Sequence, residues 1–218
     1  MFGQSKPNLP VSVSAIVLAG GRSSRFGRDK SLLLLKGEPL LVQIINKLVT
    51  LSNDLIVVTN QPERYGFLSL PARLLSDERP GEGSLMGIYS GLKAARHFHA
   101  LVVACDMPFL NLSLLHHMIS LAEGHDVVIP RVNGLLEPLH AIYSKACLPA
   151  MGRLLEQGQR QIIAFFHEVR VCYVEEEVVD RFDPEHLSLI NINTRQDWDR
   201  VQQFLRSDTE AERSQGHG

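Results

Sequence analysis

Cysteine and long hydrophobic runs are scarce in this sequence. Its three cysteines, Cys105, Cys147 and Cys172, are odd in number, and no two stand at the spacing of a metal knuckle or a redox motif. This pattern argues against a disulfide framework or a zinc site and favours a reducing cytoplasm. The longest apolar runs, such as residues 32–35, are far too short to span a membrane, and residues 1–10 lack the apolar core of a secretory signal. We therefore expect a cytoplasmic protein without a membrane partner.

An excess of charge of either sign is also absent. The 218 residues include 22 Lys and Arg against 24 Asp and Glu, which gives a formal net charge of −2. Such a balance creates no general attraction for nucleic acid, so we expect no nucleic-acid partner. With 44% hydrophobic and 21% charged residues, the composition excludes collagen, a coiled coil and intrinsic disorder. We predict a single domain over residues 11–206, followed by a disordered polar tail at 207–218.

Short apolar runs alternate with stretches of helical period along the chain. The runs that we predict to be strands are 14–18, 55–58, 72–75, 100–104, 126–129, 139–143, 169–174 and 187–192. The stretches that we predict to be helices are 40–49, 83–92, 111–122 and a last helix from Thr194 that carries Trp198, Val201, Phe204 and Leu205. Strands that alternate with helices of this length predict an α/β fold, a Rossmann-like three-layer sandwich with a mostly parallel sheet.

The segment after the first predicted strand is rich in glycine and positive charge. In an open α/β sheet, ligands bind beyond the carboxyl ends of the strands. There Gly20 and Gly21 allow the backbone to approach a ligand closely. Four cations follow, opposed only by Asp29: Arg22, Arg25, Arg28 and Lys30. We interpret this segment as a triphosphate-binding loop; the alternative is an ordinary solvated loop.

Two familiar phosphate-binding motifs are missing from that loop. No Gly-Lys-Ser/Thr follows at P-loop spacing, and no Gly-x-Gly-x-x-Gly is present. Kinase, GTPase and dehydrogenase interpretations are weakened accordingly.

Two aspartates follow later strands of the predicted sheet. Asp77 comes just after the run 72–75, and Asp106 comes just after 100–104 and before Met107-Pro108. Magnesium takes one or two carboxylates and completes its shell with phosphate oxygens and water. Asp106 is therefore our candidate magnesium ligand, and a turn aspartate before a proline is the alternative.

Three glycines share one face of a predicted helix. Gly83, Gly87 and Gly91 recur at a spacing of four residues. We expect Gly91 to pack against the sheet and Gly83 to begin the helix, where free backbone N–H groups can contact a base or ribose.

The segment after the first strand reads Leu18-Ala19-Gly20-Gly21-x-x-x-Arg25-Phe26-Gly27-x-Asp29-Lys30. This motif resembles the signature of the molybdenum cofactor guanylyltransferases, within the nucleotidyltransferase superfamily. Asp106-Met107-Pro108-Phe109 resembles the magnesium motif of that family. Two later segments resemble the substrate-side motifs of the family: Glu137-Pro138-Leu139-His140-Ala141 and Asn191-Ile192-Asn193-Thr194. Two positions depart from the family pattern: Ser84 replaces a proline and Phe26 replaces a methionine.

The resemblance implies a fold of the nucleotidyltransferase type and a magnesium-dependent transfer of GMP. The acceptor would be the terminal phosphate of molybdenum-bound molybdopterin, and the products would be the guanine dinucleotide cofactor and pyrophosphate. The partners would be GTP and molybdenum-molybdopterin, with molybdenum-insertion and target apoenzyme proteins as further candidates. The nucleotide part would span about 11–110 and the second-substrate part about 111–206.

The resemblance also implies roles for individual residues. Candidate catalytic residues are Lys30, Asp106 and Arg25, and Asp106 would bind Mg²⁺. The residues that would contact the nucleotide are Leu18, Ala19, Gly20, Gly21, Lys30, Asp77, Gly83, Asp106 and either Thr59 or Asn60, of which we favour Asn60. The sequence assigns no role to Asn191 or Asn193, and we interpret His140 as a half-buried strand histidine.

Three other functions stay open at this point. One is CMP transfer to molybdopterin, and another is nucleotidyl transfer to a different small phosphate, such as a sugar 1-phosphate or phospholactate. The third is a non-catalytic nucleotide-binding module, which the presence of both Lys30 and Asp106 argues against.

Overall fold

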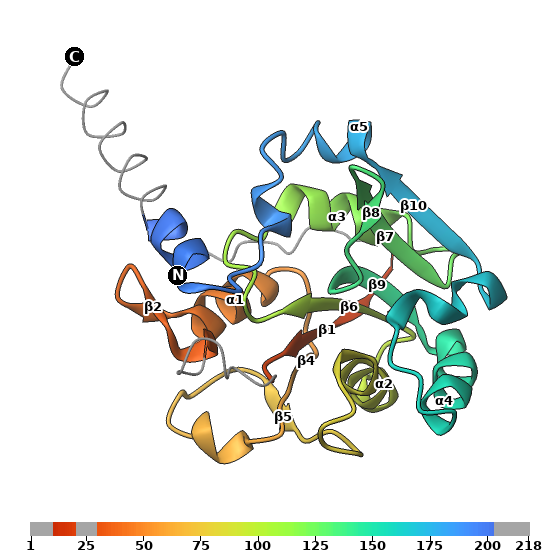
Figure 1. Ribbon diagram of the computed structural model, residues 1–218, viewed down its shortest axis with the longest axis horizontal. Coiled ribbons are helices and arrows are strands. Elements are labelled where there is room, and N and C mark those ends of the chain that lie inside the picture. Colours follow the sequence, from red (N-terminus) through yellow and green to blue (C-terminus); the bar gives the residue numbers. More distant parts are fainter. Residues whose placement is uncertain (1–10, 21–29, 203–218) are drawn as a thin grey trace.

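The computed structural model describes residues 11–20 and 30–202, with an eight-stranded sheet at its centre (Figure 1). The strands of this sheet are β1 (Val13–Leu18), β4 (Leu55–Val58), β5 (Arg73–Leu75), β6 (His99–Ala104), β7 (Val127–Val132), β8 (Leu135–Leu136), β9 (His140–Ser144) and β10 (Val171–Glu175). They follow the order β10-β7-β9-β6-β1-β4-β5, and β8 pairs with β7. A separate hairpin joins β2 (Leu34–Leu35) to β3 (Glu38–Pro39).

The sheet is mostly parallel, as predicted, with one reversed strand inside it. β1 runs parallel to β4 and β6, β4 to β5, and β7 to β10. β9 runs antiparallel to both β6 and β7. The reversal places the first residue of β9, His140, opposite Val103 near the end of β6. The carboxyl ends of the parallel strands and the beginning of β9 therefore share one edge of the sheet.

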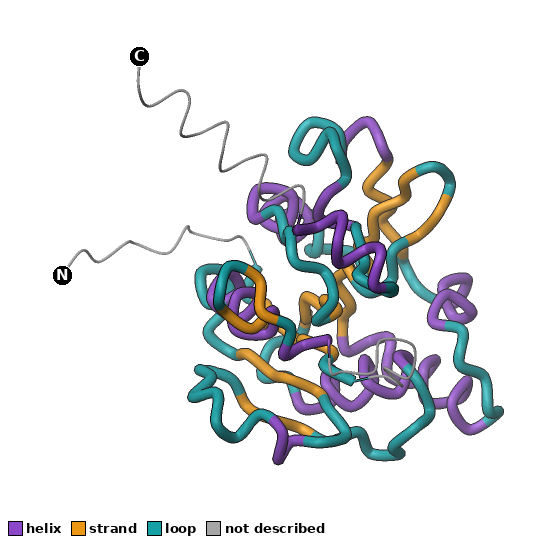
Figure 2. The backbone as a smooth tube through the Cα atoms, turned by 60° about the vertical axis from the view of Figure 1, so that its left-hand side comes forward, coloured by secondary structure: helices purple, strands orange, loops and turns teal. Residues whose placement is uncertain are grey.

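Helices cover both faces of the sheet, as the buried runs of the strands require. The helices are α1 (Leu40–Leu48), α2 (Ser84–Ala94), α3 (Leu112–Ser120), α4 (Leu148–Glu156) and α5 (Glu176–Val179). Along β1, Ala15 and Val17 pack in the core with α1 and α3, whereas Ile16 and Leu18 pack in the core with α2 and α4. The turned view in Figure 2 shows the strands between the helices. The predicted three-layer sandwich is confirmed.

A third, smaller core joins the β2–β3 hairpin and the start of α1 to the last described part of the chain. Residues 195–202 form a helix, and the buried side chains of this core are Leu35, Leu40, Ile192, Trp198 and Val201. The predicted last helix is thus confirmed up to residue 202. Phe204, Leu205 and the predicted tail at 207–218 lie outside the described residues. The single domain over 11–206 stays a prediction.

The predicted strand at 187–192 is wrong. The chain forms a 3-10 turn at Leu187–Leu189, followed by an irregular stretch. The cause is the buried Asp183 carboxylate, which accepts hydrogen bonds from Leu187 N at 3.1 Å and from Ser188 N at 2.8 Å. Those bonds bend the backbone where the apolar pattern suggested extension.

The described chain contains four further 3-10 segments: Lys30–Leu32, Pro62–Arg64, Lys145–Cys147 and Ile162–Glu168. Among the residues that the structure describes, no helix has both the length and the apolar character needed to cross a membrane.

Candidate active site

Hydrogen bonds continue beyond the carboxyl ends of the central strands. Ala19 N donates to Val58 O at 2.9 Å, and Cys105 N donates to Leu18 O at 3.1 Å. Thr59 N donates to Leu75 O at 2.8 Å. These bonds hold the segments that follow β1, β4, β5 and β6 side by side, so the predicted site residues share one edge of the sheet.

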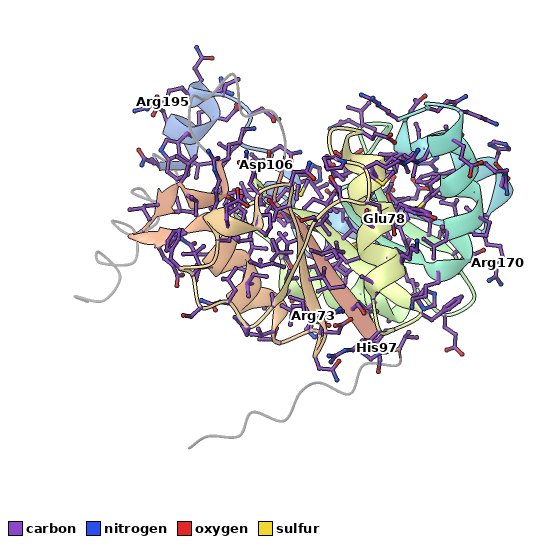
Figure 3. All side chains as sticks on the ribbon, turned by 90° about the horizontal axis from the view of Figure 1, so that it is seen from below. Arg73, Glu78, His97, Asp106, Arg170 and Arg195 are labelled. Carbon is purple, nitrogen blue, oxygen red and sulfur yellow. The ribbon has the colours of Figure 1, made fainter. Side chains whose placement is uncertain are left out.

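Figure 3 shows Asp106 in the upper part of the view and Arg73 and His97 at the bottom. Arg73 begins β5 and His97 precedes β6, whereas Asp106 follows β6, so the view separates the amino ends of these strands from the end that carries Asp106.

Lys30, Asp106 and Asn193 meet at this edge. Lys30 Nζ lies 3.3 Å from Asp106 Oδ2 and 3.2 Å from Asn193 Oδ1. The side chains of Lys30 and Asp106 are only 17% and 20% exposed, so their charges are partly shielded from water. Lys30 opens a 3-10 turn that leads into the β2–β3 hairpin, which explains how a residue early in the chain reaches Asp106.

Asn193 reaches this cluster because its neighbours are fixed on both sides. Ile192 N donates to Asp106 O at 2.9 Å, and the Ile192 side chain is fully buried. Thr194 caps the last helix: its hydroxyl accepts from Asp197 N at 3.1 Å, while Thr194 N donates to Asp197 Oδ2 at 2.7 Å. This reciprocal pair is a capping box. The Asn191-Ile192-Asn193-Thr194 motif by itself gives Asn193 no role, because the contact of Asn193 with Lys30 depends on long-range packing.

Asp77 and Asn60 form a second polar pair at the same edge. Burial raises the pKa of the Asp77 carboxyl, and a hydrogen bond from the Asn60 side chain opposes that rise. Asp77 Oδ1 is buried without a hydrogen-bond partner among the described residues. Thr59, in contrast, is buried, and its hydroxyl accepts from Gln61 N at 3.2 Å. Of the two open candidates, Asn60 is the one whose side chain forms a hydrogen bond with Asp77; which of them contacts a nucleotide stays a prediction.

The glycines of α2 allow this helix to pack closely against the sheet. A Cβ at Gly87 would lie 3.2 Å from Leu18 Cδ2 and 3.5 Å from Asp77 Oδ1. Gly83 precedes the helix with φ +86°, a conformation that favours glycine, and its carbonyl accepts from Gly87 N. The first turn of α2 thus lies near Asp77.

Glu137 lies in the turn that leads into the reversed strand, and His140 begins that strand. Glu137 Oε2 accepts from Asn191 Nδ2 at 3.4 Å, and burial raises its pKa, with a smaller contribution from the negative charge of Asp106. His140 is fully buried, which corrects the half-buried interpretation, because Ala141, Ile142 and the rest of β9 lie inside the sheet. Burial lowers the pKa of His140 to about 4. A neutral, enclosed imidazole is a part of the core and not an acid or base for substrate.

Some of the predicted site lies outside the described residues: Gly21, Arg25, and the neighbouring Arg22, Phe26, Arg28 and Asp29. Of the remainder, the structure brings Lys30 to Asp106, and Asn60 to Asp77. Leu18 is the last residue of β1, Ala19 and Gly20 follow it, and Gly83 immediately precedes α2. Their contacts with a nucleotide stay predictions.

The two oxygen atoms that face Lys30, Asp106 Oδ2 and Asn193 Oδ1, are ligands of the kind that a hard cation prefers. The Asp106 carboxylate and the Asn193 amide oxygen both already face one positive charge, and oxygen ligands of this kind fit Mg²⁺. Within residues 11–20 and 30–202, no group of three or more His, Cys, Asp or Glu side chains could hold a metal ion.

Comparison with known proteins gives one consistent result. The model of the MobA-like NTP transferase domain matches residues 15–171. A relative from Desulfosudis oleivorans, named molybdenum cofactor guanylyltransferase, is 35% identical over 198 residues, which cover 90% of this chain and 97% of the relative. One from Chloroflexus aggregans, named probable molybdenum cofactor guanylyltransferase, is 37% identical over 199 residues, which cover 88% and 95%.

A solved structure agrees with these sequence matches. This structure is molybdopterin-guanine dinucleotide biosynthesis protein A from Archaeoglobus fulgidus. It matches with a TM-score of 0.78 and 29% sequence identity, and the match covers 89% of this chain and 100% of the other chain.

Proposed function

The chain belongs to the family of MobA-like NTP transferase domains, and on that premise we propose that it transfers GMP from GTP to the terminal phosphate of molybdenum-bound molybdopterin. The products are the guanine dinucleotide form of the cofactor and pyrophosphate. The observation that carries this proposal is the meeting of Lys30, Asp106 and Asn193 beyond the carboxyl ends of the same sheet that carries the Asp77–Asn60 pair. Lys30 offers positive charge for phosphates, and the Asp77 carboxylate offers a hydrogen-bond acceptor for a base.

The acceptor phosphate attacks the α-phosphorus of GTP in line with the departing pyrophosphate. A phosphate oxygen is already anionic at neutral pH, so this chain has no need of a general base. Its residues instead orient the two substrates and offset negative charge. Lys30 supplies mobile positive charge next to the reacting phosphates, and the partly enclosed position of its ammonium strengthens that attraction.

Asp106 and Asn193 are the residues that would hold Mg²⁺. When bound, this ion supplies charge neutralisation to the triphosphate. The support for the assignment is the hard oxygen pair that both side chains present to Lys30 Nζ. Asp106 keeps its place because Ile192 N binds its carbonyl oxygen.

Asp77 is the residue that would select guanine. Guanine presents adjacent N–H donors, and Asp77 Oδ1 is a buried acceptor that no described residue satisfies. A base without those donors would leave this oxygen unpaired, at a cost of about 1–3 kcal/mol. Asn60 holds the carboxylate in place through its hydrogen bond.

The partners in this proposal are GTP and molybdenum-molybdopterin, with proteins that insert molybdenum or receive the finished cofactor as further partners. We place the reaction in the cytoplasm, which the odd number of cysteines supports.

The decisive experiment is turnover with purified molybdenum-molybdopterin and Mg²⁺, using GTP and CTP in parallel. We expect pyrophosphate release and formation of the guanine dinucleotide with GTP, and much slower release with CTP. Faster turnover of CTP would assign the chain to cytidylyl transfer. Pyrophosphate release that depends on a sugar 1-phosphate or phospholactate, and not on the pterin, would contradict the proposed acceptor. Nucleotide binding without any turnover would favour the non-catalytic module.

A further inference from the structure

Asn193 can hold Lys30 only if the irregular stretch 189–193 keeps one conformation. Its C-terminal side is fixed by the Thr194–Asp197 capping box. Its centre is fixed by Ile192, whose backbone N–H binds Asp106 O and whose side chain is buried. On its N-terminal side, the stretch is held by Asn191. The side-chain amide of Asn191 donates to the Glu137 carboxylate, with Asn191 Nδ2 3.4 Å from Glu137 Oε2.

Glu137 is itself held rigidly by the sheet. Its backbone N–H donates to Pro130 O at 3.3 Å on β7, and its carbonyl accepts from His140 N at 3.0 Å. Its other carboxylate oxygen, Oε1, accepts from Leu139 N at 3.4 Å. Leu139 O in turn accepts from Ala104 N at 3.1 Å, and Ala104 is the last residue of β6, two positions before Asp106. The Glu137 carboxylate therefore has a fixed direction relative to Asp106.

The turn 137–140 thus links two parts of the active site that are remote in sequence. Asp106 belongs to the first part, and Asn191 and Asn193 belong to the last described part of the chain. Glu137 is half-buried, and it lies close enough to Asp106 for their charges to interact. Nothing in the proposed chemistry requires a second carboxylate there, so a different purpose is indicated.

We propose that Glu137 is a positioning residue that acts through Asn191 to hold Asn193 against Lys30 and Asp106. The expected effect of Glu137 on kcat rests on the proposed function. Its expected effect on the position of Asn193 and on the accessibility of Lys30 does not. Without Glu137, Asn191 loses its partner in the turn before β9, Asn193 samples other positions, and Lys30 loses one of the two oxygen contacts that it has among the described residues.

A double-mutant cycle between Glu137 and Asn193 separates positioning from a purely structural role. The variants are Glu137→Ala, Asn193→Ala and the double variant. Glu176→Ala is the matched control, because Glu176 accepts from Asn133 N at 2.8 Å and so supports the same β7–β8 hairpin without touching Asn191. Glu137→Gln is the conservative variant, since its amide oxygen can still accept from Asn191.

The first readout is the rate at which Lys30 is modified by an amine-reactive reagent, followed by mass spectrometry. Exposed Lys93, whose side chain is 55% accessible, serves as the internal reference. We expect Glu137→Ala and Asn193→Ala each to raise the Lys30 rate several-fold, and the double variant to react no faster than Asn193→Ala. Glu176→Ala and Glu137→Gln should stay near the wild-type rate. An unchanged Lys30 rate in Glu137→Ala would overturn the inference.

The second readout is kinetic, with thermal melting as a check on folding. We expect Glu137→Ala to lower kcat about tenfold, as couplings within such networks allow, with a smaller effect on the KM for GTP. In the Asn193→Ala background the same substitution should have no further effect. Additive losses, or an equal loss in Glu176→Ala, would contradict positioning through Asn193. An inactive wild-type protein would instead contradict the proposed function, and the labelling rates would still decide the role of Glu137.

Discussion

Lys30 and Asp106 are 76 positions apart in the sequence, yet Lys30 Nζ lies 3.3 Å from Asp106 Oδ2. The same ammonium lies 3.2 Å from Asn193 Oδ1. It therefore contacts the two oxygens that we assign to magnesium. On that assignment, Lys30 and a divalent ion would compete for one oxygen pair until the phosphates of GTP offered Lys30 other partners.

That competition predicts an unusual effect of Lys30→Met on metal binding. Removal of the competing cation should raise the affinity for free Mn²⁺ by about fivefold, because one ion pair of this kind is worth about 1 kcal/mol. The affinity for GTP should fall in the same variant, since its phosphates lose their countercharge. Electron paramagnetic resonance titrations of Mn²⁺, with and without GTP, measure both effects. Lys93→Met is the control, and unchanged Mn²⁺ binding in Lys30→Met would contradict the shared oxygen pair.

Asp106→Asn should separate chemistry from folding. The substitution keeps the size of the side chain and the backbone carbonyl that binds Ile192 N, but it removes the negative charge. We expect an unchanged thermal melt and a fall in magnesium-dependent turnover by about 10²–10³-fold. Near-normal turnover with an unaltered magnesium requirement would place the metal elsewhere, and an unfolded variant would identify Asp106 as a structural turn residue.

Asp77→Asn should weaken the preference for guanine. The amide keeps one oxygen but can turn its N–H₂ group toward the base, where it meets the N–H donors of guanine. We expect GTP affinity to fall about tenfold or more, with little change for CTP, because the lost interaction is worth about 1–3 kcal/mol. Calorimetric titration measures both affinities. Glu78→Gln is the neighbouring control, and an equal loss for both nucleotides would count against base selection by Asp77.

Gly91→Ala and Gly152→Ala should change stability in opposite directions. A Cβ at Gly91 would lie 2.8 Å from Ile16 Cγ2 and 3.1 Å from Val58 Cγ2, and overpacking of this kind costs about 1–3 kcal/mol. At Gly152 in α4 the nearest atom, Tyr89 Cε2, would be 3.7 Å away, so the helix should gain about 0.5–1 kcal/mol. Urea unfolding measures both, and a stabilised Gly91→Ala would show that α2 can move from the sheet.

His140 should make the protein less stable below neutral pH. Burial lowers its pKa to about 4 from 6.5, so the unfolded chain binds the proton more readily than the folded protein. The free energy of unfolding should therefore fall as the pH drops from about 6.5 toward 4, by up to about 3 kcal/mol. His140→Phe should remove this slope, as measured by urea unfolding at several pH values. Exposed His167 offers the control His167→Gln, and an identical slope in His140→Phe would assign the pH dependence to other groups.

The layered fold and half of the active site follow from local patterns in the sequence. The buried runs 14–18, 55–58 and 100–104 have no polar alternation, and sequences of that kind form strands covered on both faces. Asp77 and Asp106 could be placed at the ligand edge because they directly follow such runs. These inferences need only the neighbours of each residue along the chain.

Tertiary structure alone decided how the residues after β7, among them Glu137 and Asn193, come to lie near Asp106. The reversal of β9 depends on strand pairing, and it brings Glu137 and His140 to the edge that carries Asp106. The stretch 187–192 has the apolar content of a strand, but the buried carboxylate of Asp183 competes successfully for its backbone N–H groups. Asn193 meets Lys30 across 163 positions because Ile192 is buried in a core shared with Leu35 and Trp198. Local sequence cannot encode such contacts, since their energy comes from groups that only the folded chain brings together.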